Sequence, residues 1–229
     1  MFKQYAKFAI IPLTIICSGL SVAGVSSPAV MQEIKQIQND WGKLYFLEEF
    51  KNNNYKELQA LARKANYLSK KHPDSAEALT WDAIVLSSLA EKKGGIGALS
   101  LVKEAKKKLE AAESIDPTVL DGSVYASLAT LYWKVPGWPI AFGSDTKAEQ
   151  YFKKALMISP DQLDANYFYA DFLADDNQYA LALLHLDKAL HAPTLEGRPF
   201  ADKGRRQQAQ KLRQHLIGLN LYSKQVVER

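Results

Sequence analysis

The spacing of apolar residues indicates helices along most of the chain. From residue 29 onward apolar side chains recur every three or four positions, which places them on one face of an α-helix, and no stretch alternates convincingly with a period of two. The pattern therefore predicts an all-α fold. The predicted helices cover residues 29–49, 54–71, 75–91, 99–115, 120–134, 146–158, 162–175, 178–191 and 200–222.

Two of the predicted helix starts carry a capping signature. Asp74 is followed by Glu77, and Thr146 is followed by Glu149, so each pair offers an acceptor at the first position and a carboxylate three residues later. We therefore expect Asp74 and Thr146 to cap the helices that follow them.

One spacing of small and large residues occurs three times between residues 105 and 193. An alanine is followed four positions later by a large apolar residue, then by a second alanine and a proline. The alanines let paired helices approach closely, the large residues fill the gaps between them, and the proline ends the second helix. The copies are Ala105, Leu109, Ala112 and Pro117; Ala148, Phe152, Ala155 and Pro160; and Ala182, Leu186, Ala189 and Pro193.

The helix before each copy supplies a second, matching pattern, and Tyr125, Leu128, Ala129 and Tyr132 are its clearest case. Together the two halves resemble the tetratricopeptide-repeat (TPR) family. The resemblance implies a solenoid of helical hairpins over residues 51–199. Because each repeat buries its apolar face only against its neighbours, the last repeat needs a cover, and we expect residues 200–229 to form a capping helix.

The first residues have the layout of a secretory signal peptide. Lys3 and Lys7 precede an apolar run over residues 8–17, and the small-residue triplet Ser21-Val22-Ala23 follows. We expect a signal peptide over residues 1–23 and export, to a periplasm, of a chain that begins with a helical segment over residues 24–50. The alternative is a retained membrane anchor, because an apolar run extended to residue 25 could just cross a bilayer.

Charge and cysteine content exclude several classes of function. The net charge of +4 includes the two lysines of the signal segment, so the predicted exported chain is close to balanced. This charge does not indicate a nucleic-acid partner. Cys17, the single cysteine, lies within the predicted signal peptide and lacks the small preceding residues of a lipidation site. The exported chain would therefore contain neither a disulfide nor a thiolate metal site. We expect membrane contact only through the signal segment.

No catalytic or cofactor motif is present. The sequence has no HExxH or GxSxG, and Gly94-Gly95-Ile96-Gly97 lacks the preceding strand and the following Gly-Lys of a phosphate loop. Asp171 and Asp175 stand one helical turn apart and could share a cation, although such pairs are more often solvated helix ends. The lysines at 103 and 106–108 predict a solvated outer face, with a membrane or an acidic partner as the alternative. We expect no enzyme, no metal and no cofactor.

Two repeats contain insertions, since successive copies of the motif lie 43 and 34 residues apart and a TPR unit has 34 residues. The insertions cover residues 91–100 and 135–145, and we expect both to form enlarged loops on one edge of the solenoid. The second holds Trp138 and Phe142 on a proline-stiffened frame, where they could contact a ligand. The alternative is that both rings fold back between the helices.

The concave face of the predicted solenoid is the second expected binding surface. Its residues would come from first-helix positions that do not pack against the second helix. They mix aromatic and polar groups, which suits a peptide or a small organic ligand. The candidates are Thr80, Ile84, Thr130, Trp133, Tyr167 and Asp171.

A narrower similarity covers residues 132–206. The segments 132–139, 142–143, 166–169, 197–199 and 204–206 resemble the T-component proteins of TRAP transporters, which are exported helical-repeat proteins that help to deliver small organic ligands. Those proteins are often lipid-anchored, whereas this chain has no lipidation site.

These patterns lead to two hypotheses about function. The first is an exported, non-enzymatic TPR scaffold that binds a protein or peptide partner through its concave face and the Trp138 loop. The alternative, implied by the TRAP resemblance, is an accessory of a transport system that binds a small molecule of the organic-acid type. Both hypotheses are compatible with a homo-oligomer.

Overall fold

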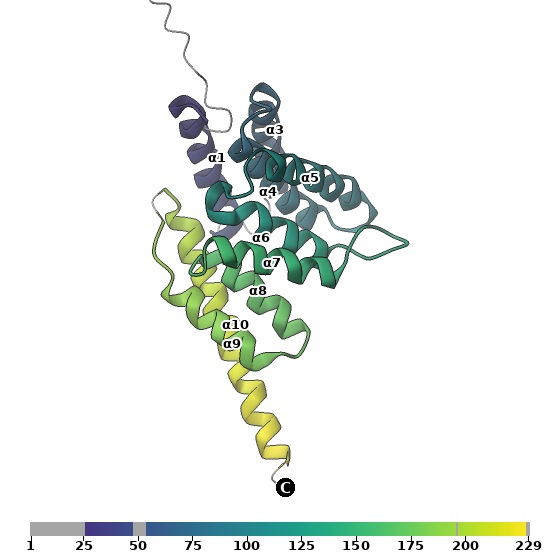
Figure 1. Cartoon of the computed structure of the whole chain (residues 1–229), viewed down its shortest axis with the longest axis vertical. Coiled ribbons are helices and arrows are strands. Elements are labelled where there is room, and N and C mark those ends of the chain that lie inside the picture. The colour runs from purple at the N-terminus through teal and green to yellow at the C-terminus, as the bar shows by residue number, and fades with distance from the viewer. Residues whose placement is uncertain (1–25, 48–53, 196, 228–229) are drawn as a thin grey trace, which may run out of the picture.

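The structure is a computed structural model that describes residues 26–47, 54–195 and 197–227 (Figure 1). The predicted signal peptide over residues 1–23 lies outside the described residues. Across the described ranges, no helix combines the length and the apolar content that a membrane span requires.

Every regular element in the described ranges is a helix, which confirms the all-α prediction. Most helix boundaries lie within three residues of the predicted ones. The helices are α1 (Pro28–Phe46), α3 (Tyr55–Lys71), α4 (Ala76–Lys93), α5 (Gly95–Ile115), α6 (Val119–Lys134), α7 (Asp145–Ile158), α8 (Leu163–Asp175), α9 (Tyr179–His191) and α10 (Pro199–Val227).

Serines, and not the predicted residues, cap α4 and α7. Ser75 Oγ accepts a hydrogen bond from the Ala78 N–H at 3.0 Å, and Ser144 Oγ accepts from the Lys147 N–H at 3.4 Å. Both serines have the extended backbone of an N-cap residue. The predictions of Asp74 and Thr146 as caps were therefore wrong by one residue and two residues, respectively.

The alanine motif marks the contact between the two helices of each hairpin. In Figure 1 α4 and α5, α6 and α7, and α8 and α9 form successive helix pairs, and each pair packs closely. All nine alanine and large apolar positions of the motif are fully buried, because the missing side-chain atoms of alanine leave room for the neighbouring helix. The buried positions are Ala105, Leu109, Ala112, Ala148, Phe152, Ala155, Ala182, Leu186 and Ala189.

The first helices of these pairs form an inner row, in which α4 contacts α6 and α6 contacts α8. At the ends of this row α1 packs on α4 and α10 packs on α8, and α1 and α10 also contact each other. Five helices therefore form a closed ring of contacts.

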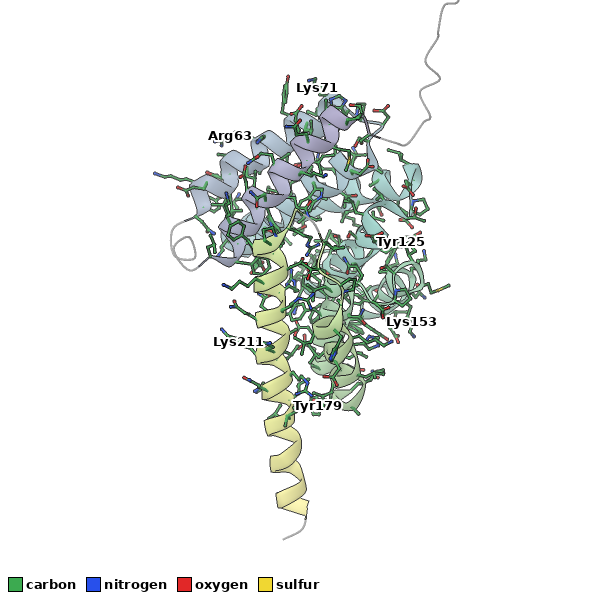
Figure 2. All side chains as sticks on the ribbon, turned by 90° about the vertical axis from the view of Figure 1, so that its left-hand side faces the viewer. Arg63, Lys71, Tyr125, Lys153, Tyr179 and Lys211 are labelled. Atoms are coloured by element: carbon green, nitrogen blue, oxygen red, sulfur yellow. The ribbon has the colours of Figure 1, made fainter. Side chains whose placement is uncertain are left out.

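The contact between α1 and α10 depends on small residues. Gly42 of α1 faces Ala201 of α10, and a Cβ atom at Gly42 would lie 3.3 Å from the Ala201 nitrogen. Gly204 of α10 lies against the ring of Phe46. Helix α10 thus covers the last hairpin by packing on α8 and α9, as a cap would, and also joins the two ends of the chain. Its last turns project beyond the other helices (Figure 2).

The segment 91–100 is not the enlarged loop that its glycines suggest. Helix α4 continues to Lys93, and α5 begins at Gly95. The turn between them is formed by Gly94 and Gly95, with φ of 62° and 57°. The additional residues therefore lengthen two helices. The physical reason is that two consecutive glycines with positive φ are sufficient to end one helix and start the next.

Candidate functional site

The inner faces of the five ring helices bring together aromatic and charged side chains that are distant in the sequence. We call this group the inner-face cluster. Each ring helix contributes at least one member. The cluster comprises Tyr45 from α1, Glu91 from α4, Trp133 and Lys134 from α6, Tyr167 and Asp171 from α8, and Arg205 from α10.

Lys134 is the accessible cation of the cluster. Its Nζ lies 3.1 Å from the centroid of the Trp133 ring, 3.5 Å from Asp171 Oδ2 and 3.9 Å from Asp175 Oδ2. Burial raises the pKa of Asp171, and Lys134 opposes this shift. About half of the Lys134 side chain is exposed, so its ammonium group can also meet a ligand from solvent.

Arg205 closes the opposite side of the cluster. Its guanidinium lies 4.2 Å from the centroid of Phe168, 4.8 Å from that of Tyr167 and 5.3 Å from that of Phe46. The Arg205 Nε donates to Asp164 Oδ1 at 2.8 Å. Arg205 is buried, and cation–π contacts of this kind gain strength when water is excluded.

Asp164 anchors two arginines of the C-terminal part of the chain. It accepts hydrogen bonds from Arg205 and from Arg198, and Arg198 also donates to Asp202. Burial alone would raise the pKa of Asp164, but the two arginines outweigh it and lower the pKa to about 2. The carboxylate is therefore fully ionised at neutral pH and holds α10 against α8.

Tyr45 and Glu91 connect α1 to α4 at the edge of the cluster. The Tyr45 hydroxyl donates to Glu91 Oε2 at 2.8 Å. Burial and the neighbouring Glu91 raise the pKa of Tyr45, so the phenol remains protonated and Glu91 remains the acceptor. This pair gives the cluster a carboxylate opposite Arg205.

Three of the six concave-face candidates, Trp133, Tyr167 and Asp171, belong to the inner-face cluster. Ile84 and Thr130 are half-buried on the neighbouring helices, and the Thr130 hydroxyl donates to the carbonyl of Ala126. Thr80 does not reach the surface. It is fully buried, and its hydroxyl donates to the Ala76 carbonyl at 2.7 Å. The reason is that this turn of α4 is buried on every side, since all of residues 78–83 are buried.

Trp138 and Phe142 occupy different environments, although both come from the loop over residues 135–144. Phe142 folds inward and packs edge-on against Tyr132, with ring centroids 5.6 Å apart, and Lys106 of α5 lies 5.6 Å from its ring. Trp138 projects into solvent with 89 % of its surface exposed. Figure 1 shows this loop protruding from the right-hand edge of the molecule.

Main-chain hydrogen bonds define the shape of this loop. The Gly143 N–H donates to the Pro136 carbonyl at 2.9 Å, and the Ser144 N–H donates to the Tyr132 carbonyl at 2.7 Å. A Cβ atom at Gly143 would lie 1.8 Å from the Val135 carbonyl oxygen, so this position requires glycine. The exposure of Trp138 is therefore a consequence of an ordered loop.

Sequence reasoning missed four members of the inner-face cluster. Lys134 and Arg205 lie in segments that carry the TRAP resemblance, but nothing in their spacing shows that they face the same space. Tyr45 and Glu91 come from helices that meet only after α1 folds back onto α4. The local sequence does not show which charged residues or tyrosines will face one another after the helices pack.

Two clefts are found elsewhere in the described residues. One of about 440 Å³ lies between α1 and α3 and includes Asp40 and Lys64, and one of about 340 Å³ lies between α9 and α10 and includes Asp187 and Arg213. Neither cleft includes Trp138 or a member of the inner-face cluster. Within the described part of the chain, no group of three or more histidine, cysteine or acidic side chains is placed to hold a metal ion.

Comparisons with known proteins add no assignment. No family model matches the sequence, and a search of curated proteins finds no similar chain.

Proposed function

We propose that this chain is an exported, non-enzymatic scaffold of the TPR type that binds a segment of a partner protein at the inner-face cluster. The repeat spacing supports the TPR assignment, because its alanines occupy the contacts between paired helices. The layout of residues 1–23 supports export.

The observation that carries this proposal is the position of Lys134 between Trp133 and Asp171. An exposed ammonium group beside an aromatic ring and a carboxylate offers an apolar surface, a donor and an acceptor within one small area. A peptide presents the same three kinds of group, so such a surface suits a protein segment. The cluster shows no nucleophile held by a base, and therefore binding accounts for it better than catalysis.

A site-specific crosslinking experiment tests this proposal. A photo-crosslinking amino acid is placed at position 133 in the full chain, produced with its own N-terminus in the native host, and compared with the same amino acid at the exposed position 157 on α7. We expect position 133 to crosslink to one defined protein, which mass spectrometry then identifies, and position 157 not to do so.

Substitutions then test the residues with the purified partner. We expect Trp133→Ala and Tyr167→Ala each to weaken binding by about 2 kcal/mol, as for central aromatic residues of an interface, whereas Met157→Ala leaves binding unchanged. Circular dichroism of each variant shows whether its helices are intact. Unchanged affinity in both aromatic variants would contradict the proposal.

A second candidate function is the binding of a small organic acid in a transport system. The position of Lys134 beside the Trp133 ring favours it, because an accessible ammonium group next to an aromatic surface also suits an organic carboxylate. Native mass spectrometry of the purified full chain distinguishes the two. A retained organic acid that is lost on Lys134→Gln would support the transport function, and its absence would leave the protein partner as the assignment.

A further inference from the structure

Three exposed apolar side chains lie where the chain turns from the first to the second helix of two consecutive hairpins. Ile96 follows the turn between α4 and α5, and Trp138 and Ile140 lie on the loop between α6 and α7. Their exposed fractions are 87 %, 89 % and 63 %, respectively. Both turns are on the right-hand side of Figure 1. We call this side of the molecule the Trp138 edge.

The exposure of these side chains is built into the backbone. The α4–α5 junction is formed by Gly94 and Gly95, which both have positive φ, and Ile96 follows at once in the first turn of α5. In the other loop the Ile140 and Ala141 N–H groups both donate to the Gly137 carbonyl, and this turn holds the tip away from the helices. Phe142, from the same loop, is packed on Tyr132. The loop therefore buries one aromatic ring and presents another.

The shape of the Trp138 edge limits what can cover it. The apolar groups are separate protruding tips, whereas a surface that receives a peptide is normally a groove. Several protruding apolar side chains can enter a bilayer interface together, because a lipid surface needs no pockets to receive them. Tryptophan is also the residue that accumulates at the level of lipid headgroups, because its ring is apolar and its indole N–H can remain hydrogen-bonded.

The charges around the tips favour an anionic surface. Three lysines near the tips are exposed. Lys93 is the last residue of α4, Lys147 lies in the first turn of α7, and Lys103 lies two turns into α5. Lys147 lies 5.2 Å from the Tyr132 ring, at the base of the Trp138 loop. Most of the nearby acids are bonded to other side chains. Glu104 pairs with Lys108, Glu149 pairs with Lys153 and Glu91 accepts a hydrogen bond from Tyr45, whereas Asp145 is exposed.

We infer that the Trp138 edge docks on the surface of an anionic lipid bilayer, with Trp138, Ile140 and Ile96 at headgroup depth and the lysines against lipid phosphates. The contact is peripheral and positions the scaffold beside a membrane. It differs from the expectation that only the signal segment meets lipid, and it does not depend on the proposed partner at the inner-face cluster.

Fluorescence quenching by brominated lipids tests this inference on the full chain. The chain has four tryptophans, and Trp138→Phe removes one fluorophore while keeping an aromatic ring at the tip. The difference between the two proteins therefore reports the surroundings of Trp138 alone. Any binding through residues 1–25 is common to both proteins and cancels. We expect vesicles of brominated phosphatidylglycerol and phosphatidylcholine to quench the Trp138 signal, and pure brominated phosphatidylcholine to quench it several-fold less.

Two further variants complete the test. Lys93→Gln combined with Lys147→Gln should raise the lipid concentration needed for half-maximal quenching of Trp138 on the order of 10-fold. Met157→Asn, at an exposed methionine far from this loop along α7, should not change it. A Trp138 signal that stays unquenched on vesicle-bound protein, or that is quenched equally on neutral vesicles, would overturn the inference. So would shielding of Trp138 by the purified partner protein alone.

Discussion

Arg205 and Asp164 join the C-terminal helix to the inner row of helices, through a hydrogen bond of 2.8 Å from the arginine Nε to the carboxylate Oδ1. The residues are far apart in the sequence, and both charges are largely removed from water. Asp164 also accepts a hydrogen bond from Arg198, which is paired with Asp202 as well, so two carboxylates balance two guanidinium groups. The position of α10, and with it the ring of five helices, depends on the Asp164 carboxylate.

We expect Asp164→Asn to lower the free energy of unfolding by about 3 kcal/mol, because it removes the carboxylate that pairs with the buried Arg205 and leaves Arg198 with Asp202 alone. The control is Asp187→Asn, which breaks the bond to Arg213 between two side chains that are 40 % and 48 % exposed. A surface pair of this kind contributes less than about 1 kcal/mol. Urea denaturation of both variants at neutral pH measures the difference. Equal losses would show that Asp164 carries no special structural role.

The sequence predicted the hairpins because their contacts are local. The alanines of the motif meet residues within the same repeat, so their spacing alone specifies which faces are buried. The meeting of α1 and α10 has no such signal. This contact joins helices that are far apart in the sequence. From the sequence alone, Gly204 could be a close contact or only a weak point in its helix, because the Phe46 ring beside it is not known.

Position within a repeat was sufficient to predict that three of the candidate residues face the same side of their helices. Trp133, Tyr167 and Asp171 occupy inner positions of their helices and reach the same space. Thr80 is also a first-helix candidate, but it lies in a turn of α4 that is buried on every side, and burial of this kind cannot be inferred from repeat offsets. The sequence also could not predict that Phe142 would be packed and Trp138 exposed, because this depends on which of the two rings fits beside Tyr132.

The close approach of α10 to α1 makes a second prediction. A Cβ atom at Gly204 would lie 2.1 Å from Phe46 Cδ1 and 2.6 Å from Phe46 Cβ, so rotation of the ring cannot relieve the clash. We expect Gly204→Ala to cost about 1–3 kcal/mol of stability. Gly218, on the same helix, has no neighbour within 4 Å of such an atom, and Gly218→Ala should stabilise the helix by up to about 1 kcal/mol. Thermal unfolding followed by circular dichroism compares the two, and a stabilising Gly204→Ala would refute the close contact.

The buried His185 predicts a pH dependence of stability. Asn166 donates from Nδ2 to the carbonyls of Pro160 and Gln162, so its Oδ1 is left to accept from His185 Nδ1 at 2.9 Å. Burial, with a smaller contribution from Lys188, lowers the pKa of His185 to about 4. The unfolded chain, with an ordinary pKa near 6.5, therefore takes up the proton first as the pH falls.

The stabilisation from neutral His185 is complete above about pH 6.5 and is lost as the pH falls towards 4. Its full size is roughly 3 kcal/mol. Denaturant unfolding at pH 7 and at pH 4.5 measures the loss, and His185→Gln, which cannot titrate, should show a smaller difference between the two conditions. Asp164 does not interfere, because its own loss of stabilisation begins only below about pH 4. The same pH dependence in wild type and variant would exclude His185 as its source.

The last prediction concerns Lys108, which the sequence placed on a solvated outer face. Its Nζ lies 2.8 Å from Oδ2 of the fully buried Asp82, and its side chain is only 13 % exposed. Lys108→Met leaves that carboxylate without a cation, and we expect a loss of about 3–5 kcal/mol at neutral pH. Lys107→Met, at the exposed neighbouring position, should change stability by less than about 0.5 kcal/mol. Burial already raises the pKa of Asp82, and removal of Lys108 raises it further, so the folded variant binds this proton more tightly than the unfolded chain does. The loss in Lys108→Met should therefore shrink as the pH is lowered from 7 to 5, and urea unfolding at both pH values shows whether it does.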